Sequence, residues 1–260
     1  MQRIAVAGPV GALTAFDTGP RGTGLPVVLV HGINMSAGVW DELVEQLGDR
    51  RVVTVDLRGH GSSVMTGPYD ADAYADDVLA VMEERGIERA HLVGTSFGGP
   101  VACAVAARHP GRVASVTALG SAVAAGDAVD IDAGIAAMRQ VGAHDFFTGF
   151  LAQASFAPGT EPGLIEQAVA AASGRDLDTI EEVTRTAFGA DASDIVAKVS
   201  APALVLTGEH DMTCPVPAGE QLATALGTTL HVLPDRGHMA MVEDPAAVAA
   251  VIQPHLRAND

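Results

Sequence analysis

The sequence predicts an α/β fold in which a mostly parallel, doubly wound sheet of eight strands has helices on both faces. Short apolar runs alternate with amphipathic helical segments along most of the 260 residues, and this alternation is typical of parallel sheets built from βαβ units. Glycines stand where many of these runs end, as tight turns between a strand and a helix require. The alternation stops between residues 121 and 198, where helical patterns follow one another and no strand is expected.

In the first part of the chain, residues 3–17 predict two short strands separated by glycines and a proline. The run LPVVLV (25–30) is apolar enough for a strand that is covered on both faces. A further strand, RVVTVDL (51–57), precedes an amphipathic helix that begins after Asp70, a residue suited to an N-cap, and ends at Gly86.

Three more strands complete the predicted sheet after the one whose apolar run ends at Gly94. They are RVASVTALG (112–120), APALVLTGEHD (201–211) and TTLHVLPDRGH (228–238), and a last helix begins at Asp244-Pro245. Between the first two of them lie helical pieces that are broken by glycine and proline, at residues 130–141, 143–153, 161–172 and 176–188. We therefore expect a core made of residues 1–120 and 199–260, with a helical insertion at 121–198.

The net charge and the distribution of apolar residues indicate which kinds of partner the protein binds. A formal net charge of −17 argues against nucleic acid and against an anionic membrane surface, since both bind basic faces. No apolar run approaches the roughly 18 residues of a membrane span, and the N-terminal MQRIAVAGPV lacks the apolar segment of a secretory signal. We expect a cytoplasmic protein that acts on a small molecule, and we make no prediction of its oligomeric state.

The stretch HLVGTSFGG (91–99) carries the strongest chemical signal. It predicts a strand, one sharp turn with Ser96 at its apex, and a helix. A turn this tight forces the apex residue into a sparsely populated backbone region at a cost of about 1–3 kcal/mol. Gly94 and Gly98 lack side chains, so the strand and the helix can approach closely. The Ser96 hydroxyl would then stand exposed beside a helix N-terminus.

This G-x-S-x-G turn resembles the nucleophile elbow of the α/β-hydrolase superfamily. Further motifs of that superfamily occur in the same order along the chain: HG at 31–32, DLRGHGS at 56–62, GEHD at 208–211 and GHM at 237–239. The resemblance implies an antiparallel pair of strands at the edge of the sheet and an all-helical cap inserted after the sixth strand. It covers nearly the whole chain outside that cap.

A serine hydroxyl needs a base within hydrogen-bond reach, and the base needs an orienting anion. The resemblance implies the chain order serine, acid, histidine. Asp211 and His238 fill these slots, in loops at the carboxyl ends of successive strands, where ligands bind in open α/β sheets. Glu209 and Asp191 are the alternatives for the acid. Other histidines, such as His31 and His60, lie in turns that suggest structural roles, and we expect Asp56 to tie its own loop to Arg58.

The oxyanion formed by attack on a carbonyl needs donors already in place, each worth about 3–4 kcal/mol. One is the backbone N–H of Phe97, which follows the nucleophile, and the resemblance assigns the other to Ile33. The Asn34 side chain either contacts the substrate or forms hydrogen bonds with the backbone of its own turn.

The side chains of the catalytic loops and the insertion predict an apolar, aromatic-lined pocket for an uncharged acyl or aryl group. The candidates are Asn34, Met35, Trp40, Phe97, Phe146, Phe147, Phe150, Met212 and Met239. We expect Arg139, Arg175 and Arg185 to face solvent, so no carboxylate-bearing substrate is inferred. No metal-ligand spacing and no phosphate-binding loop is found, and neither a metal nor a cofactor is expected.

The sequence therefore predicts a serine hydrolase that cleaves a carboxylic ester or lactone through an acyl-serine. Within the superfamily, dehalogenases and epoxide hydrolases carry aspartate at the position of Ser96. Carbon–carbon hydrolases often have tryptophan after the histidine, where this chain has Met239. Carbon–carbon hydrolysis, acyl transfer and cofactor-free perhydrolysis on the same residues stay open, as does a ligand-binding protein on a hydrolase scaffold.

Overall fold

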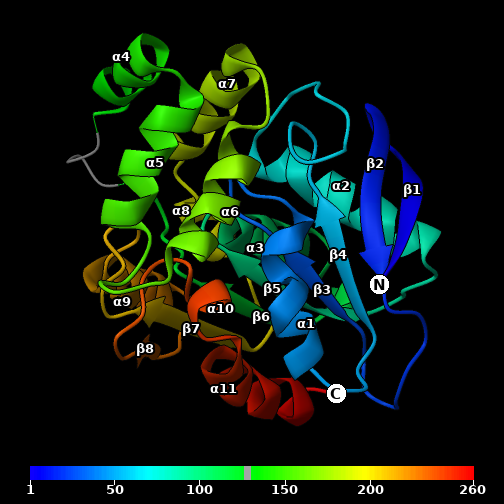
Figure 1. Ribbon diagram of the computed structural model, residues 1–260. Coiled ribbons are helices and arrows are strands. Elements are labelled where there is room, and N and C mark those ends of the chain that lie inside the picture. Colours follow the sequence, from blue (N-terminus) through cyan, green and yellow to red (C-terminus); the bar gives the residue numbers. More distant parts are fainter. Residues whose placement is uncertain (126–129) are drawn as a thin grey trace.

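A computed structural model describes residues 1–125 and 130–260, and a single sheet of eight strands runs through it (Figure 1). The strand order is β1-β2-β4-β3-β5-β6-β7-β8. β1 pairs antiparallel with β2 and β2 antiparallel with β4, whereas all other neighbours are parallel. The strands are β1 (Gln2–Gly8), β2 (Gly11–Asp17), β3 (Val27–Val30), β4 (Val52–Asp56), β5 (Ala90–Thr95), β6 (Val113–Leu119), β7 (Ala203–Gly208) and β8 (Leu230–Leu233). The predicted fold class is confirmed.

Helices cover both faces of the sheet, and each face has its own apolar core. On one face, α3 (Gly98–Arg108) packs against β5 and β6, and α2 (Ala71–Glu84) packs against α3 and β1, with Tyr74 and Val101 in their shared core. On the other face, α1 (Asp41–Gln46) and α11 (Pro245–Ala258) pack against β3. The central strands β3, β4, β5 and β6 are buried along their whole length, which explains their nearly unbroken apolar sequences.

Short helices complete the layers around the sheet. They are η1 (Ala37–Trp40), η2 (Pro110–Arg112), α9 (Val216–Ala225) and α10 (Ala240–Glu243). As the sequence predicts, Asp70 caps α2 by accepting the N–H of Ala73 at 2.8 Å, and Asp244 caps α11 through Ala247 at 2.9 Å.

The cap between β6 and β7 is helical. It contains α4 (Ile131–Val141), α5 (Ala143–Ala154), α6 (Pro162–Ser173), α7 (Leu177–Phe188) and α8 (Ser193–Val196), and its small core is built around Met138, Phe147 and Ile180. Residues 126–129, within the predicted insertion, lie outside the described residues. In Figure 1 the cap helices stand together on one side of the sheet. None of the described helices is both long enough and apolar enough to cross a membrane.

Candidate active site

The turn between β5 and α3 has the strained geometry that the glycine spacing predicts. Ser96 has a φ of +53°, in the left-handed region that non-glycine residues seldom occupy. A Cβ on Gly94 would lie 2.0 Å from the carbonyl oxygen of Gly98, and one on Gly98 would lie 2.3 Å from that of Val30. Only glycine fits at these two positions, and their absent side chains allow α3 to start directly beside the sheet.

The hydroxyl of Ser121 supports this turn from the neighbouring strand. Its Oγ donates to the carbonyl oxygen of Ser96 at 2.8 Å, and the N–H of Ser96 donates to the carbonyl of Leu119 at 2.9 Å. Ser121 follows β6 and carries no motif, so sequence reasoning missed it. Its partners become neighbours only when β5 and β6 pair.

Asp211 and His238, from the loops after β7 and β8, form a buried hydrogen-bonded pair. His238 Nδ1 lies 2.9 Å from Asp211 Oδ2, while Asp211 Oδ1 accepts the N–H groups of Thr213 at 2.9 Å and Cys214 at 2.7 Å. A carboxylate accepts hydrogen bonds, so this contact favours the tautomer of the neutral imidazole that carries its proton on Nδ1 and leaves the lone pair of Nε2 free. Gly120 makes room for the pair, since a Cβ there would lie 3.0 Å from Asp211 Oδ2.

Ser96 and His238 both line a cavity of about 670 Å³. Its other walls come from the loop after β3, from α5 and from α6, and most of its side chains are apolar. The predicted pocket residues that lie on its walls are Asn34, Met35, Phe147, Phe150 and Met239. The cavity therefore brings together residues from the core and from the cap.

The structure places the remaining pocket candidates elsewhere. Trp40 is fully buried in the core beside Leu43, and the Phe97 ring packs edge-on against Tyr74, with centroids 6.2 Å apart. Phe146 packs into the cap core. Met212 has 71% of its surface exposed and does not line the cavity. These four residues were therefore wrongly predicted to line the pocket.

The backbone N–H groups of Ile33 and Phe97 flank the elbow. Within the described part of the chain, neither group donates a hydrogen bond to the protein. The loop that carries Ile33 runs directly beside Ser96. A Cβ on Gly32 would lie only 2.6 Å from the Ser96 Cβ. Two such donors on the loops beside the Ser96 hydroxyl could stabilise an oxyanion.

His31 and His60 are buried and connect the loops that follow β3 and β4. His31 Nδ1 lies 2.7 Å from the carbonyl of Gly32, and its Nε2 accepts the N–H of Leu57 at 3.1 Å. His60 Nε2 accepts the N–H of Asn34 at 3.1 Å. Burial lowers the pKa of both rings, which keeps them neutral. They play the structural roles that their positions in turns suggest.

Asp56 stabilises loops, but its predicted partnership with Arg58 is wrong. Its carboxylate accepts the N–H groups of Ala37 at 2.8 Å and Ser62 at 2.9 Å. Arg58 instead turns to α2 and pairs with Asp77 at 2.6 Å.

The cap arginines divide into two kinds. Arg139 and Arg185 form exposed ion pairs, for example Arg139 with Asp178 at 2.6 Å, as expected of residues that face solvent. Arg175 departs from that expectation. It reaches down from the cap, where its guanidinium donates to Asn34 Oδ1 at 2.5 Å and to the carbonyl of Gly59.

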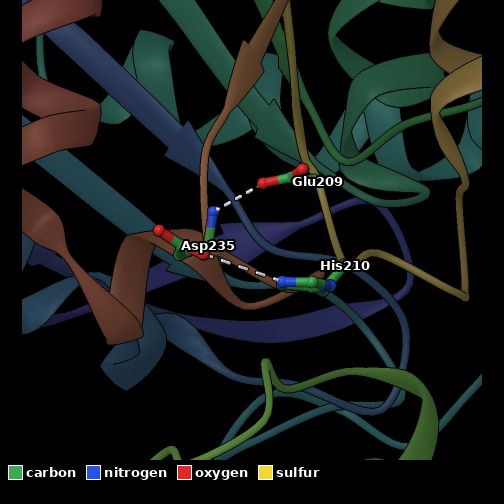
Figure 2. Close-up of side chains that lie close together, drawn as sticks. All are labelled: Glu209, His210 and Asp235. Carbon is green, nitrogen blue, oxygen red and sulfur yellow. Dashed lines mark hydrogen bonds and ion pairs between the residues drawn. The ribbon is translucent and has the colours of Figure 1, made fainter.

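Glu209, His210 and Asp235 form an exposed group on the loops that carry Asp211 and His238 (Figure 2). Within the described residues, this is the one group of such side chains whose potential metal-ligand atoms all lie within 4.8 Å of one another. Sequence spacing did not reveal it, because Glu209 and His210 follow β7 whereas Asp235 follows β8. Glu209 accepts the N–H of Asp235 at 3.0 Å, and His210 Nε2 lies 4.0 Å from the Asp235 carboxylate. These contacts already join the two loops without an ion.

Residues 27–251 match the model of the alpha/beta hydrolase family. The chain belongs to this family. The match extends from β3 into α11 and so includes the elbow, the Asp211 and His238 loops and the cap. The protein is accordingly an α/β-hydrolase.

Relatives of this α/β-hydrolase have several substrates in their names. The chain is 29% identical to the 2-hydroxymuconate semialdehyde hydrolase of Pseudomonas sp. strain CF600, over 92% of this chain and 89% of that one. It is 31% identical to a pimeloyl-acyl-carrier-protein methyl ester esterase of Neisseria meningitidis, over 86% and 91%. The enol-lactonase of Burkholderia xenovorans LB400 superimposes with a TM-score of 0.88 at 26% identity, over 98% and 100%.

Proposed function

We propose that this α/β-hydrolase cleaves a carboxylic ester or lactone of a small, largely apolar substrate through an acyl-serine intermediate. The observation that carries the proposal is the buried Asp211–His238 pair, with Nδ1 and Oδ2 2.9 Å apart, on a cavity that Ser96 also lines. The strained Ser96 backbone, with its φ of +53°, is the conformation of an elbow nucleophile.

In this mechanism, Nε2 of His238 takes the proton of Ser96 while Oγ attacks the carbonyl carbon. The N–H groups of Ile33 and Phe97 stabilise the oxyanion that forms. His238 then gives its proton to the departing alkoxide, so that an ester loses an alcohol and a lactone opens. His238 then takes a proton from water, whose oxygen attacks the acyl-serine carbonyl, and passes that proton to Ser96 Oγ as the acid leaves. Asp211 holds the imidazole in the required tautomer throughout.

The cavity favours an uncharged acyl group. Its volume of about 670 Å³ lies within the range of roughly 300–1,000 Å³ that small-molecule sites occupy. Phe147, Phe150 and Leu151 from α5 supply apolar surface, and among the described lining residues there is no arginine or lysine. The carboxylates of Asp41 and Glu42 lie exposed at its rim, where they repel an anionic substrate.

A semialdehyde substrate is the second candidate, because one relative is named for 2-hydroxymuconate semialdehyde. The absence of a cationic side chain among the described lining residues weighs against it, since that substrate carries a carboxylate. A substrate panel distinguishes the two. Neutral p-nitrophenyl esters and lactones are compared with the semialdehyde, each with and without an alcohol or peroxide acceptor.

The proposal is tested on Ser96→Ala, with Ser36→Ala as the matched control because Ser36 is another serine on the cavity wall. We expect a fluorophosphonate probe to label the wild type and Ser36→Ala on Ser96, and Ser96→Ala to lose both labelling and ester hydrolysis. Unchanged hydrolysis by Ser96→Ala would overturn the proposal. Absence of labelling in the wild type would favour a ligand-binding protein.

A further inference from the structure

Arg175, between α6 and α7, is a partly buried cation with no ion pair to a carboxylate in the described part of the chain. Its guanidinium donates to Asn34 Oδ1 at 2.5 Å and to the carbonyl of Gly59, while its buried Nε has no partner among the described residues. The neighbouring Asp176 is occupied as the cap of α7, through Thr179 at 2.8 Å. Burial lowers the pKa of Arg175 to about 10, so the side chain stays charged at neutral pH.

A charge in such a place is unfavourable for stability, because buried charges are usually paired. The two contacts that Arg175 makes are with neutral oxygens of the core, and both lie on loops at the carboxyl edge of the sheet. The contact with Asn34 matters most for the chemistry, because Asn34 directly follows Ile33, the second proposed oxyanion donor.

Asn34 is held from two sides. From the core, His60 Nε2 accepts its backbone N–H at 3.1 Å. From the cap, Arg175 binds its Oδ1, and its Nδ2 donates to Thr184 of α7 at 3.0 Å. Its φ of +57° lies in the left-handed region, which asparagine tolerates better than most non-glycine residues. Both polar ends of the side chain are thus satisfied by the cap.

We propose that Arg175 and Thr184 are positioning residues through which the cap holds Asn34, and with it the Ile33 N–H, in the geometry that stabilises the oxyanion. The inference rests on the proposed function. It assigns the cap a second role besides covering the cavity. When the cap moves away, Asn34 loses both side-chain partners, and the oxyanion donor loses its fixed place.

The kinetic test compares Arg175→Met with Arg185→Met, a matched control on the same cap whose guanidinium forms only exposed ion pairs. On a neutral p-nitrophenyl ester we expect kcat of Arg175→Met to fall roughly 10- to 100-fold, because a misplaced oxyanion donor costs this much. KM should change less than about threefold. The kcat of Thr184→Val should fall less than that of Arg175→Met. The kcat of Arg175→Lys should lie between those of Arg175→Met and the wild type. Arg185→Met should match the wild type.

Inhibition by a trifluoromethyl ketone, which forms an oxyanion adduct with a reactive serine, provides a second measurement of oxyanion stabilisation. Its inhibition constant should rise in Arg175→Met by the same factor by which kcat/KM falls. A higher KM with unchanged kcat would overturn the inference, since Arg175 would then shape only the cavity. Equal kcat in Arg175→Met and Arg185→Met would also overturn it.

Hydrogen exchange separates failure of this inference from failure of the proposed function. The amide of Asn34 donates to His60, so its exchange reports the position of the loop without any turnover. If no ester is hydrolysed and Ser96 is not labelled, the proposed function fails. Faster exchange at residues 32–36 in Arg175→Met than in Arg185→Met would still support the positioning role, and equal exchange would refute it.

Discussion

The Asp211 carboxylate accepts three hydrogen bonds, one from His238 and two from N–H groups of its own loop. These bonds fix the orientation of the carboxylate. The imidazole therefore has one tautomer and one orientation before any substrate arrives. Such preorganisation costs nothing at the moment of reaction.

Replacing the Asp211 carboxylate by an amide should remove this control while keeping the shape. Asp211→Asn should lower kcat on a neutral ester by about 10⁴, as the equivalent change does in a serine triad. Asp235→Asn, an exposed change on the neighbouring loop, should leave kcat within about threefold. A loss of less than tenfold in Asp211→Asn would remove Asp211 from the mechanism.

Single residues also show where sequence reasoning stops. Ser96 stood out because the glycine spacing around it is a local signal. The resemblance supplied the chain order that singled out Asp211 and His238, and the structure brings these two into contact. Trp40 and Met212 were misplaced because the environment of one side chain depends on which helix face packs inward. Arg175 was misread because its partner, Asn34, is 141 residues away in the sequence.

At the scale of elements, the crossing of β5 and α3 depends on the missing side chain of Gly94. Gly94→Ala should destabilise the fold by at least about 2 kcal/mol, since overpacking against a rigid backbone is costly and the new Cβ would meet the Gly98 oxygen at 2.0 Å. Gly111→Ala is the control, because nothing lies within 4 Å of a Cβ there. Urea unfolding measures both, and equal stability of the two variants would contradict this account.

Helix α10 connects the cap to the histidine loop through Glu243. Its carboxylate accepts the N–H of Gly237 at 2.6 Å, the N–H of Ala157 at 2.5 Å and the hydroxyl of Thr160 at 2.9 Å. Gly237 precedes His238, so this one side chain joins the cap to the loop that carries His238.

Glu243→Ala should therefore cost about 1–3 kcal/mol, because it leaves buried donors without an acceptor, and it should lower kcat as well. Glu220→Ala, on the exposed side of α9, should change neither the stability nor kcat. Thermal unfolding and ester turnover check the pair. Full activity in Glu243→Ala would show that His238 holds its position without α10.

On the scale of the whole molecule, the layers and strand number followed from hydrophobic periodicity, because burial on both faces leaves a nearly continuous apolar run in each central strand. The cap helices likewise followed from their amphipathic pattern. What the sequence could not reveal was how the cap sits on the core. The contact between Arg175 and Asn34 depends on how the cap packs on the core, although the sequence pattern predicts the helices of the one and the strands of the other separately.

The buried histidines predict how the stability of the whole chain depends on pH. Burial lowers the pKa of His31, His91 and His255, and lowers that of His60 well below the ordinary value of 6.5. The unfolded chain therefore binds more protons than the folded chain as the pH falls below 6.5. The stability that neutral histidines contribute is fully present above this pH and is lost as the pH falls towards their folded pKa values.

Urea unfolding between about pH 7.5 and pH 5.5 should show a free energy of unfolding that decreases with acidity. Carboxylates with lowered pKa values, such as Asp17 and Asp244, act at lower pH. The decrease should be shallower in His60→Gln than in His144→Gln, whose wild-type side chain is 73% exposed. A free energy that rises towards pH 5.5 would contradict the prediction.

The most direct measurement is to trap the covalent intermediate. The protein is mixed with p-nitrophenyl acetate, quenched in acid within its first turnovers, digested, and mapped by mass spectrometry. We expect an acetyl group on Ser96 in the wild type and none in Ser96→Ala or His238→Ala. Ester turnover with no adduct on Ser96, or with the acetyl group on another residue, would contradict this expectation.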